Sequence, residues 1–76
     1  MKLSYECSEL IEELDSDIEE FGDIDMYAFF DKINGTTFLT DYDFIEDEPK
    51  NVKTSTVQIM KASEILKILK KQNELF

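Results

Sequence analysis

The Asn34-Gly35 pair constrains the fold of this chain more than any other feature. It lies between two runs in which apolar and polar residues alternate, at 24–33 and 36–45. An Asn-Gly pair in that setting is the strongest short-range signal for a β-hairpin, because both residue types tolerate the positive φ angles of tight turns. The sequence therefore predicts two antiparallel strands joined at this pair.

Two registers are open to this hairpin, and they differ in where the acidic residues lie. A two-residue turn would place Phe30 opposite Leu39 and would mix acidic and apolar residues on both faces. A turn over 32–35 with Gly35 as a bulge would place Phe30 opposite Phe38. Only this second register separates apolar residues from aspartates, so the pattern favours the bulged turn. The predicted core face holds Ile24, Met26, Ala28, Phe30, Phe38, Tyr42 and Phe44, and the opposite face holds Asp25, Asp31, Asp41 and Asp43.

A long amphipathic helix is predicted ahead of the hairpin. Apolar residues recur at three- and four-residue steps from Leu3 to Phe21, which is typical of one face of a helix over 4–21. Ser4 is suited to the N-cap position, and Gly22 is suited to the position that follows the last helical turn.

A third strand and a second helix are predicted after the hairpin. Charge and a proline mark 46–51 as an exposed loop. The β-branched residues of 52–60 predict a strand that begins at 52 or nearer Thr54. Ser63 is a candidate N-cap for a helix over 63–74. The 76 residues then form a single small α+β domain of order αβββα, with a three-stranded antiparallel meander and two helices packed on one face.

The net charge of −10 is distributed unevenly along the chain. Residues 1–48 carry 16 acidic residues and two lysines, whereas 49–76 carry six lysines and two acidic residues. The simplest interpretation is that an acidic front and a basic tail complement each other within the fold. An excess of acid repels anionic lipid and nucleic acid, so we expect neither a membrane nor a nucleic acid as a direct partner.

The predicted first helix carries a column of acidic residues on the side away from its apolar stripe. Neighbouring carboxylates in such a column stand about 5 to 6 Å apart, which is close to the phosphate spacing along one nucleic-acid strand. The column would then occupy the basic groove of a nuclease or of another DNA-handling protein. The simpler interpretation is a solvated helix face that confers solubility. The column comprises Glu6, Glu9, Glu13, Asp17 and Glu20.

A second acidic cluster lies at the end of the hairpin. Its spacing lacks the glycine and the terminal bidentate glutamate of a calcium-binding loop, so we expect no metal there. It is interpreted either as protection of a sheet edge against pairing or as part of the same negative surface. The cluster comprises Asp41, Asp43, Glu46, Asp47 and Glu48.

The predicted register leaves an apolar patch on the sheet face opposite the core. A connected patch of this size rarely stays in water without a use. It is interpreted as a homodimer seam, as a partner-binding surface ringed by aspartates, or as a surface covered by the second helix. Tyr27 and Phe29 are therefore candidate partner-binding residues beside the acidic ones. The patch comprises Tyr27, Phe29, Ile33, Leu39 and Ile45.

Catalytic and cofactor motifs are absent from the sequence. There is no histidine, Cys7 lies in the apolar stripe without a base, and two glycines cannot make a phosphate-binding loop. We therefore expect neither an enzyme nor a cofactor. A single cysteine, the lack of a signal-peptide pattern and the lack of a long apolar run favour a cytoplasmic protein.

Two short strings, together with the acidic first helix, resemble a known group of proteins. They are Tyr42-Asp43-Phe44-Ile45 and Leu69-Lys70-Lys71-Gln72-Asn73. The chain resembles small acidic proteins of uncharacterised function carried by conjugative elements and plasmids of Gram-positive bacteria. The resemblance implies a mobile-element setting, in which evasion of host defence by DNA mimicry is one known strategy.

The sequence leads to one main functional hypothesis and two alternatives. The main hypothesis is a small interaction protein that docks through its acidic surface to a basic protein, with inhibition of host defence by nucleic-acid mimicry as one form. The first alternative is a structural or oligomeric accessory protein that uses the aromatic sheet face. The second is a protein that neutralises a basic toxin.

Overall fold

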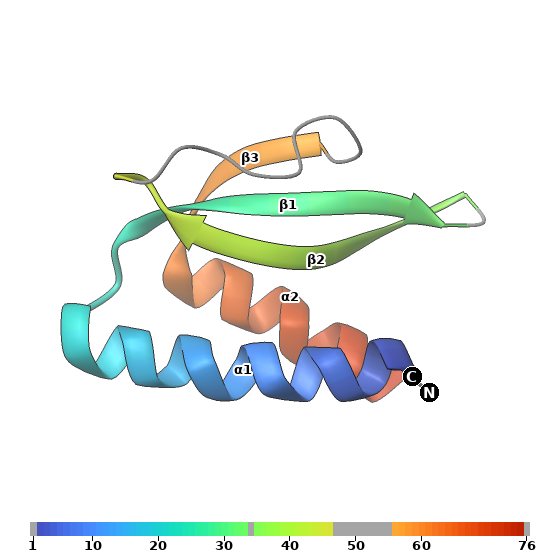
Figure 1. Ribbon diagram of the computed structural model, residues 1–76, viewed down its shortest axis with the longest axis horizontal. Coiled ribbons are helices and arrows are strands. Elements are labelled where there is room, and N and C mark those ends of the chain that lie inside the picture. Colours follow the sequence, from blue (N-terminus) through green and yellow to red (C-terminus); the bar gives the residue numbers. More distant parts are fainter. Residues whose placement is uncertain (1, 34, 47–55, 76) are drawn as a thin grey trace.

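The computed structural model describes residues 2–33, 35–46 and 56–75, which contain two helices and three strands (Figure 1). This composition confirms the α+β class and the αβββα order. The predicted strand over 52–60 is found from residue 56 on, and its first four positions lie outside the described residues. In chain order the elements are α1 (Lys2–Phe21), β1 (Asp25–Ile33), β2 (Thr36–Phe44), β3 (Thr56–Lys61) and α2 (Ala62–Leu75).

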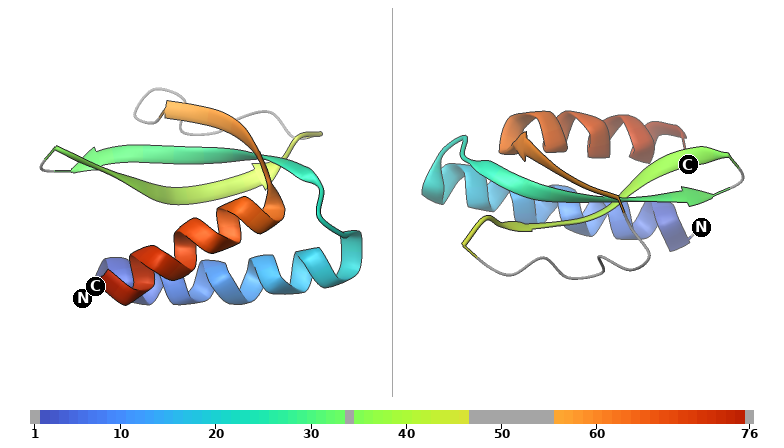
Figure 2. Two further views of the ribbon diagram at one scale, coloured as in Figure 1. Left: turned by 180° about the vertical axis from the view of Figure 1, so that it is seen from behind. Right: turned by 90° about the horizontal axis from the view of Figure 1, so that it is seen from above.

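The fold has two layers, with both helices against the same face of the sheet (Figures 1 and 2). The core lies between these layers and draws on every element except β3 for its fully buried residues. The predicted apolar stripe of α1 faces this core, since Cys7 and Leu14 are buried in it. The core residues are Cys7, Leu14, Met26, Ala28, Leu39, Ala62, Ile65 and Leu69. Of the helices that the structure describes, none is long and apolar enough to cross a membrane.

The strands are arranged in the order β2-β1-β3, and β1 pairs antiparallel with both neighbours. The predicted meander is therefore wrong in its strand order, because a meander would place β3 beside β2. The composition of β1 explains its central position. Met26 and Ala28 are buried on its helix-facing side, and Phe29 is buried on the other side. A strand with buried apolar residues on both faces is suited to the middle of a sheet.

The hairpin register differs from the predicted one. Ile33 pairs with Thr36, so that two residues join the strands, and Gly35 has a φ of 79°. Phe30 consequently lies opposite Leu39 and not opposite Phe38. The prediction of a bulge at Gly35 is wrong.

A bulge does exist, but it lies inside β2. Phe30 pairs with Leu39 and Phe29 pairs with Asp41, so Thr40 has no partner in the ladder. The Thr40 hydroxyl donates a hydrogen bond to the carbonyl oxygen of Phe29 at 3.1 Å. One extra residue shifts the alternation of every later residue in the strand.

The bulge at Thr40 places apolar residues on one face of the sheet and aspartates on the other. The sequence pattern favoured a bulge at Gly35 because it would have the same effect. Beyond Thr40, Tyr42 lies opposite Ala28 and Phe44 lies opposite Met26, so both reach the helix-facing side. Six of the seven predicted core-face residues therefore pack on the core, and the aspartates lie on the opposite face. The exception is Phe38, which exchanges faces with Leu39.

The end of α1 matches its prediction better than the beginning. Gly22 follows the helix with a φ of 87°, and its N–H donates to the carbonyl oxygen of Ile18 at 2.8 Å. This is the left-handed glycine cap that the sequence predicted. The helix begins at Lys2, however, so Ser4 lies within the first turn and is not the N-cap.

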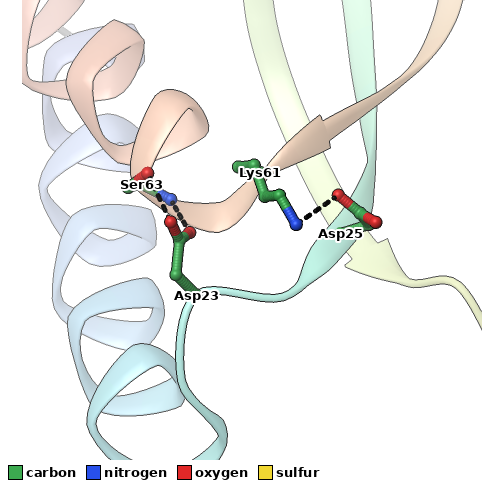
Figure 3. Close-up of polar contacts among 4 residues, drawn as sticks. All are labelled: Asp23, Asp25, Lys61 and Ser63. Atoms are coloured by element: carbon green, nitrogen blue, oxygen red, sulfur yellow. Dashed lines mark hydrogen bonds and ion pairs between the residues drawn. The ribbon is translucent and has the colours of Figure 1, made fainter.

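A distant carboxylate caps α2, contrary to the prediction that Ser63 would do so. The helix begins at Ala62, directly after β3. Ser63 donates its N–H to Asp23 Oδ1 at 2.8 Å and its hydroxyl to Asp23 Oδ2 at 2.9 Å (Figure 3). Asp23 lies between α1 and β1, so the cap ties the start of the last helix to the first connection of the chain.

Asp23 makes stability depend on pH in a direction that can be tested. The hydrogen bonds from Ser63, first that of its backbone N–H and then that of its hydroxyl, hold the pKa of Asp23 below its ordinary value of 3.8. A carboxylate whose pKa is lower in the folded than in the unfolded state stabilises the fold at pH values above its ordinary pKa. This stability is lost as the pH falls through the pKa of the folded state. We expect Asp23→Asn to melt at a lower temperature than the wild type at pH 7.

The same comparison at acid pH provides the control. Protonated Asp23 resembles asparagine, so the difference in melting temperature between the two proteins should shrink below about pH 4. Thermal melts by circular dichroism at several pH values measure it. A difference that stays constant from pH 7 to pH 2 would contradict a role for the ionised carboxylate.

Candidate functional site

The outer face of α1 is strongly acidic. Glu9, Glu13 and Glu20 are exposed, as the acidic column predicted, and Asp17 is half-buried. The side chain of Glu6 lies outside the described residues. Further exposed carboxylates on the same helix are those of Glu12, Asp15 and Glu19.

The carboxylates of α1 form no ion pair among the residues that the structure describes. Within residues 7–32, 35–46 and 56–75, no acidic side chain of α1 forms an ion pair. The acidic front and the basic tail meet in one described ion pair, in which Lys61 Nζ lies 3.2 Å from Asp25 Oδ1 (Figure 3). Among the described residues, the predicted complementarity between the acidic front and the basic tail is thus limited to Lys61 and Asp25 and does not involve α1.

Asp17 differs from the rest of the column because it contacts the sheet. The Tyr42 hydroxyl donates to Asp17 Oδ2 at 3.5 Å, which links α1 to β2. Burial, followed by the negative charge of Asp17, raises the pKa of Tyr42 far above its ordinary value of 10.0. The phenol thus stays protonated and remains a donor. Among the described residues, Asp17 has a hydrogen-bond partner, whereas Glu13 and Glu20 have none.

The aspartates of β2 bind the backbone at an edge of the sheet. β2 is an outer strand, and each aspartate accepts a hydrogen bond from the backbone N–H of the next residue. Asp41 Oδ1 lies 2.8 Å from the nitrogen of Tyr42, and Asp43 Oδ1 lies 3.0 Å from the nitrogen of Phe44. This arrangement supports the edge-protecting interpretation of the second acidic cluster. Of its other members, Glu46 is exposed, and Asp47 and Glu48 lie outside the described residues.

Gln72 completes this protection from α2, and the sequence reasoning missed it. Its side chain is buried, accepts the N–H of Leu39, and donates from Nε2 to the carbonyl oxygen of Leu39 at 3.1 Å. Nε2 also lies 3.5 Å from Cys7 Sγ. The available signal was its spacing, three residues after the buried Leu69 on the same helical stripe.

The aromatic patch on the sheet is not the exposed surface that the sequence predicted. Phe29 is 1% exposed, Phe38 is 8% exposed and Tyr27 is half-buried. Leu39 belongs to the core, and α2 does not cover this face, since both helices pack on the other one. Phe29 is therefore not accessible to a partner in this fold.

An accessible apolar surface lies instead where α1 and β2 end. Phe21, Ile24, Phe44 and Ile45 line an open groove of about 630 Å³, and Asp25 and Glu46 complete its lining. Phe21 is 52% exposed and Ile45 is 39% exposed. The rings of Phe21 and Phe44 meet edge to face with their centroids 5.4 Å apart. We call these six residues the Phe21 groove.

Sequence reasoning missed the Phe21 groove because it assigned Phe21 to the buried stripe of the helix. The signal that marks Phe21 as different is its position at the last residue of α1, directly before Gly22, where the stripe leaves the core. Glu20, the last member of the acidic column, immediately precedes it. The acidic face of α1 and the Phe21 groove thus adjoin. The chain matches no protein-family model, no curated protein and no solved structure in the three comparisons made.

Proposed function

We propose that this protein is a small acidic interaction module that binds a basic protein through the outer face of α1 and the adjoining Phe21 groove. One observation carries the proposal: the described carboxylates of that face, apart from Asp17, are exposed and form no ion pair with any residue that the structure describes. Like charges three and four residues apart oppose helix formation by a few tenths of a kcal/mol per pair. A basic partner would relieve this repulsion and would be attracted over a distance of about one Debye length.

The Phe21 groove provides the apolar part of the proposed interface. Binding energy at protein interfaces concentrates in a few apolar or aromatic anchors that enter a pocket, while charges at the rim direct the encounter. Phe21 and Ile45 supply exposed apolar area, and Asp25 and Glu46 supply negative charge beside it. The segment that fits is one with a large apolar side chain next to a lysine or an arginine.

The class of partner that we propose is a protein with a basic groove for nucleic acid. Two features support it: the regular spacing of carboxylates along α1, and the 16 acidic residues against two lysines in the first 48 residues. Such a protein would hold α1 in place of a phosphate backbone, so this chain would act as its inhibitor. Carriage on a mobile element, and a host-defence protein as the target, are part of the same proposal.

Charge neutralisation on α1 tests the proposal. Replacing Glu9 and Glu13 by glutamine should weaken binding to a purified basic partner, identified by co-purification, about tenfold at low salt, because each exposed charge contact contributes up to about 1 kcal/mol. Isothermal titration calorimetry at low and high salt measures this effect. The matched control replaces Glu64 and Glu74, which are exposed on α2, and should leave the affinity nearly unchanged.

Two outcomes would contradict different parts of the proposal. An affinity that is equal at low and high salt would exclude docking through the acidic face. A partner that binds this protein and a DNA duplex at the same time would exclude mimicry, because a mimic must displace the nucleic acid that it replaces.

A further inference from the structure

We propose that the free edge of β3 pairs with β3 of a second copy of this chain, so that two three-stranded sheets join into one continuous sheet. This inference concerns a different surface from the acidic face of α1. It depends on which backbone groups of β3 point away from β1, on how the opposite edge of the sheet is protected, and on the charge of β3 itself.

The hydrogen bonds of Gln72 establish the direction of the backbone groups. Gln72 binds both the N–H and the carbonyl oxygen of Leu39, so these groups point away from β1. Leu39 and its opposite residue Phe30 are therefore a non-hydrogen-bonded pair in the ladder between β1 and β2. The backbone groups of Phe30 consequently point to the other neighbour of β1, which is β3.

Hydrogen-bonded and non-hydrogen-bonded pairs alternate along an antiparallel ladder, so the direction of the backbone groups of Phe30 determines the direction of those on β3. Phe30 and Thr56 are a hydrogen-bonded pair, so Phe29 and Val57, one position along, are not. The same holds for Ile59, opposite Tyr27. Val57 and Ile59 thus direct their N–H and carbonyl groups to the free edge of β3.

The two edges of the sheet are treated differently. On β2, the outward N–H groups of Leu39, Tyr42 and Phe44 are each bound by a side chain. On β3, no hydrogen bond of this kind reaches Val57 or Ile59 from any residue that the structure describes. An exposed edge with unpaired backbone groups is a template for another strand. Among the described residues, side chains thus bind the outward N–H groups of β2 at Leu39, Tyr42 and Phe44, and none binds those of β3 at Val57 or Ile59.

The charge of β3 identifies a second copy as the occupant. β3 contains no acidic residue, whereas each of the other four described elements contains at least two. Two chains of charge −10 repel each other least where they meet through this strand. α2, which follows β3 directly, carries three exposed lysines.

The strand is also complementary to itself. In an antiparallel pair centred on Ile59, Ile59 of one copy faces Ile59 of the other, and Val57 faces Lys61. All of these positions have outward backbone groups, so each finds a partner. Ile59 is 62% exposed in the single chain and would be covered by the contact. The interface is isologous and closes as a two-fold dimer.

The oligomeric state of the full chain tests the inference. Sedimentation equilibrium from micromolar to millimolar concentration should show the wild type passing from a mass of 8.9 kDa to twice that value. Ile59→Lys places two like charges opposite each other, and Ile59→Pro removes an outward N–H without breaking the ladder to β1. Both variants should stay at 8.9 kDa while keeping the wild-type circular dichroism.

A matched control and the salt dependence separate this dimer from other associations. Leu75→Lys makes the same change at a residue that is 73% exposed on α2 and should dimerise like the wild type. Added salt should strengthen the dimer, because it screens repulsion between two acidic chains, whereas it weakens the proposed complex with a basic partner. A wild type that stays monomeric throughout, or a dimer that persists in both Ile59 variants, would overturn the inference.

Discussion

Replacing Phe29 by alanine is expected to lower the free energy of unfolding by about 3 to 5 kcal/mol. Phe29 is 1% exposed and lies on the central strand, so its ring cannot be removed without leaving a cavity or exposing its neighbours. A chain of 76 residues has a total stability of only about 4 to 11 kcal/mol. The substitution should therefore bring the protein close to unfolding at room temperature.

Phe21→Ala is the matched comparison because it removes the same atoms from a different environment. Phe21 is 52% exposed, and its described aromatic contact is the edge-to-face contact with Phe44. We expect it to cost about 1 kcal/mol of stability but to weaken binding of the basic partner. Urea denaturation followed by circular dichroism measures both variants. If Phe29→Ala cost no more than Phe21→Ala, the buried position of Phe29 would be wrong and its predicted role in partner binding would be restored.

The misplacement of Phe29 has a physical origin. Alternation along β1 indicates which residues share a face, and Tyr27, Phe29 and Asp31 do lie together, opposite Asp43, Asp41 and Phe38. It does not indicate which face is buried when both carry apolar residues. That depends on the place of the strand in the sheet, which is determined by pairing with β3 some thirty residues further along the chain. Local periodicity contains no information on such a pairing.

The hairpin illustrates how far the pattern of apolar residues can reach. The pattern required one extra, unpaired residue between Phe30 and Tyr42, so that both side chains could face the helices. The structure contains such a residue, Thr40. Periodicity is the same whether that residue stands at Gly35 or at Thr40. The Asn-Gly pair favours the tight two-residue turn, so the bulge forms inside β2 instead. The faces could thus be predicted for all but two of the residues concerned, whereas the position of the bulge could not.

Some features of the candidate site could be predicted from the sequence, and others could not. Exposure of Glu9, Glu13 and Glu20 follows from helical geometry, because they lie opposite a stripe that is buried. The Phe21 groove does not follow from it, since it forms where the ends of α1 and β2 meet in space. Edge protection by Asp41 and Asp43 was one of two interpretations of the sequence, and the choice between them required knowledge of which strand is at the edge. Residues whose exposure depends on a single element were predictable, and contacts that depend on two elements were not.

Gln72 belongs to the second kind, and its replacement is the other change with a large expected effect. Gln72→Ala should destabilise the protein by about 2 to 4 kcal/mol, because it leaves the buried N–H and carbonyl group of Leu39 without partners and opens a cavity beside Cys7. Lys71→Ala, at an exposed neighbouring position, should change stability by less than about 0.5 kcal/mol. Urea denaturation gives both values.

A third variant separates hydrogen bonding from packing. Gln72→Leu restores most of the volume but none of the hydrogen bonds, so it should remain well below the wild type in stability, and the Leu39 amide should exchange its proton with solvent faster than in the wild type. Recovery of full stability in Gln72→Leu would mean that the residue only fills space. The amide exchange rate of Leu39, measured by NMR, decides the matter independently of global stability, because this N–H has no strand beside it. With Gln72 removed, the N–H and carbonyl group of Leu39 would lose their side-chain partner, whereas Asp41 and Asp43 would still bind the N–H groups of Tyr42 and Phe44, so the loss of protection on β2 would be confined to the position of Leu39.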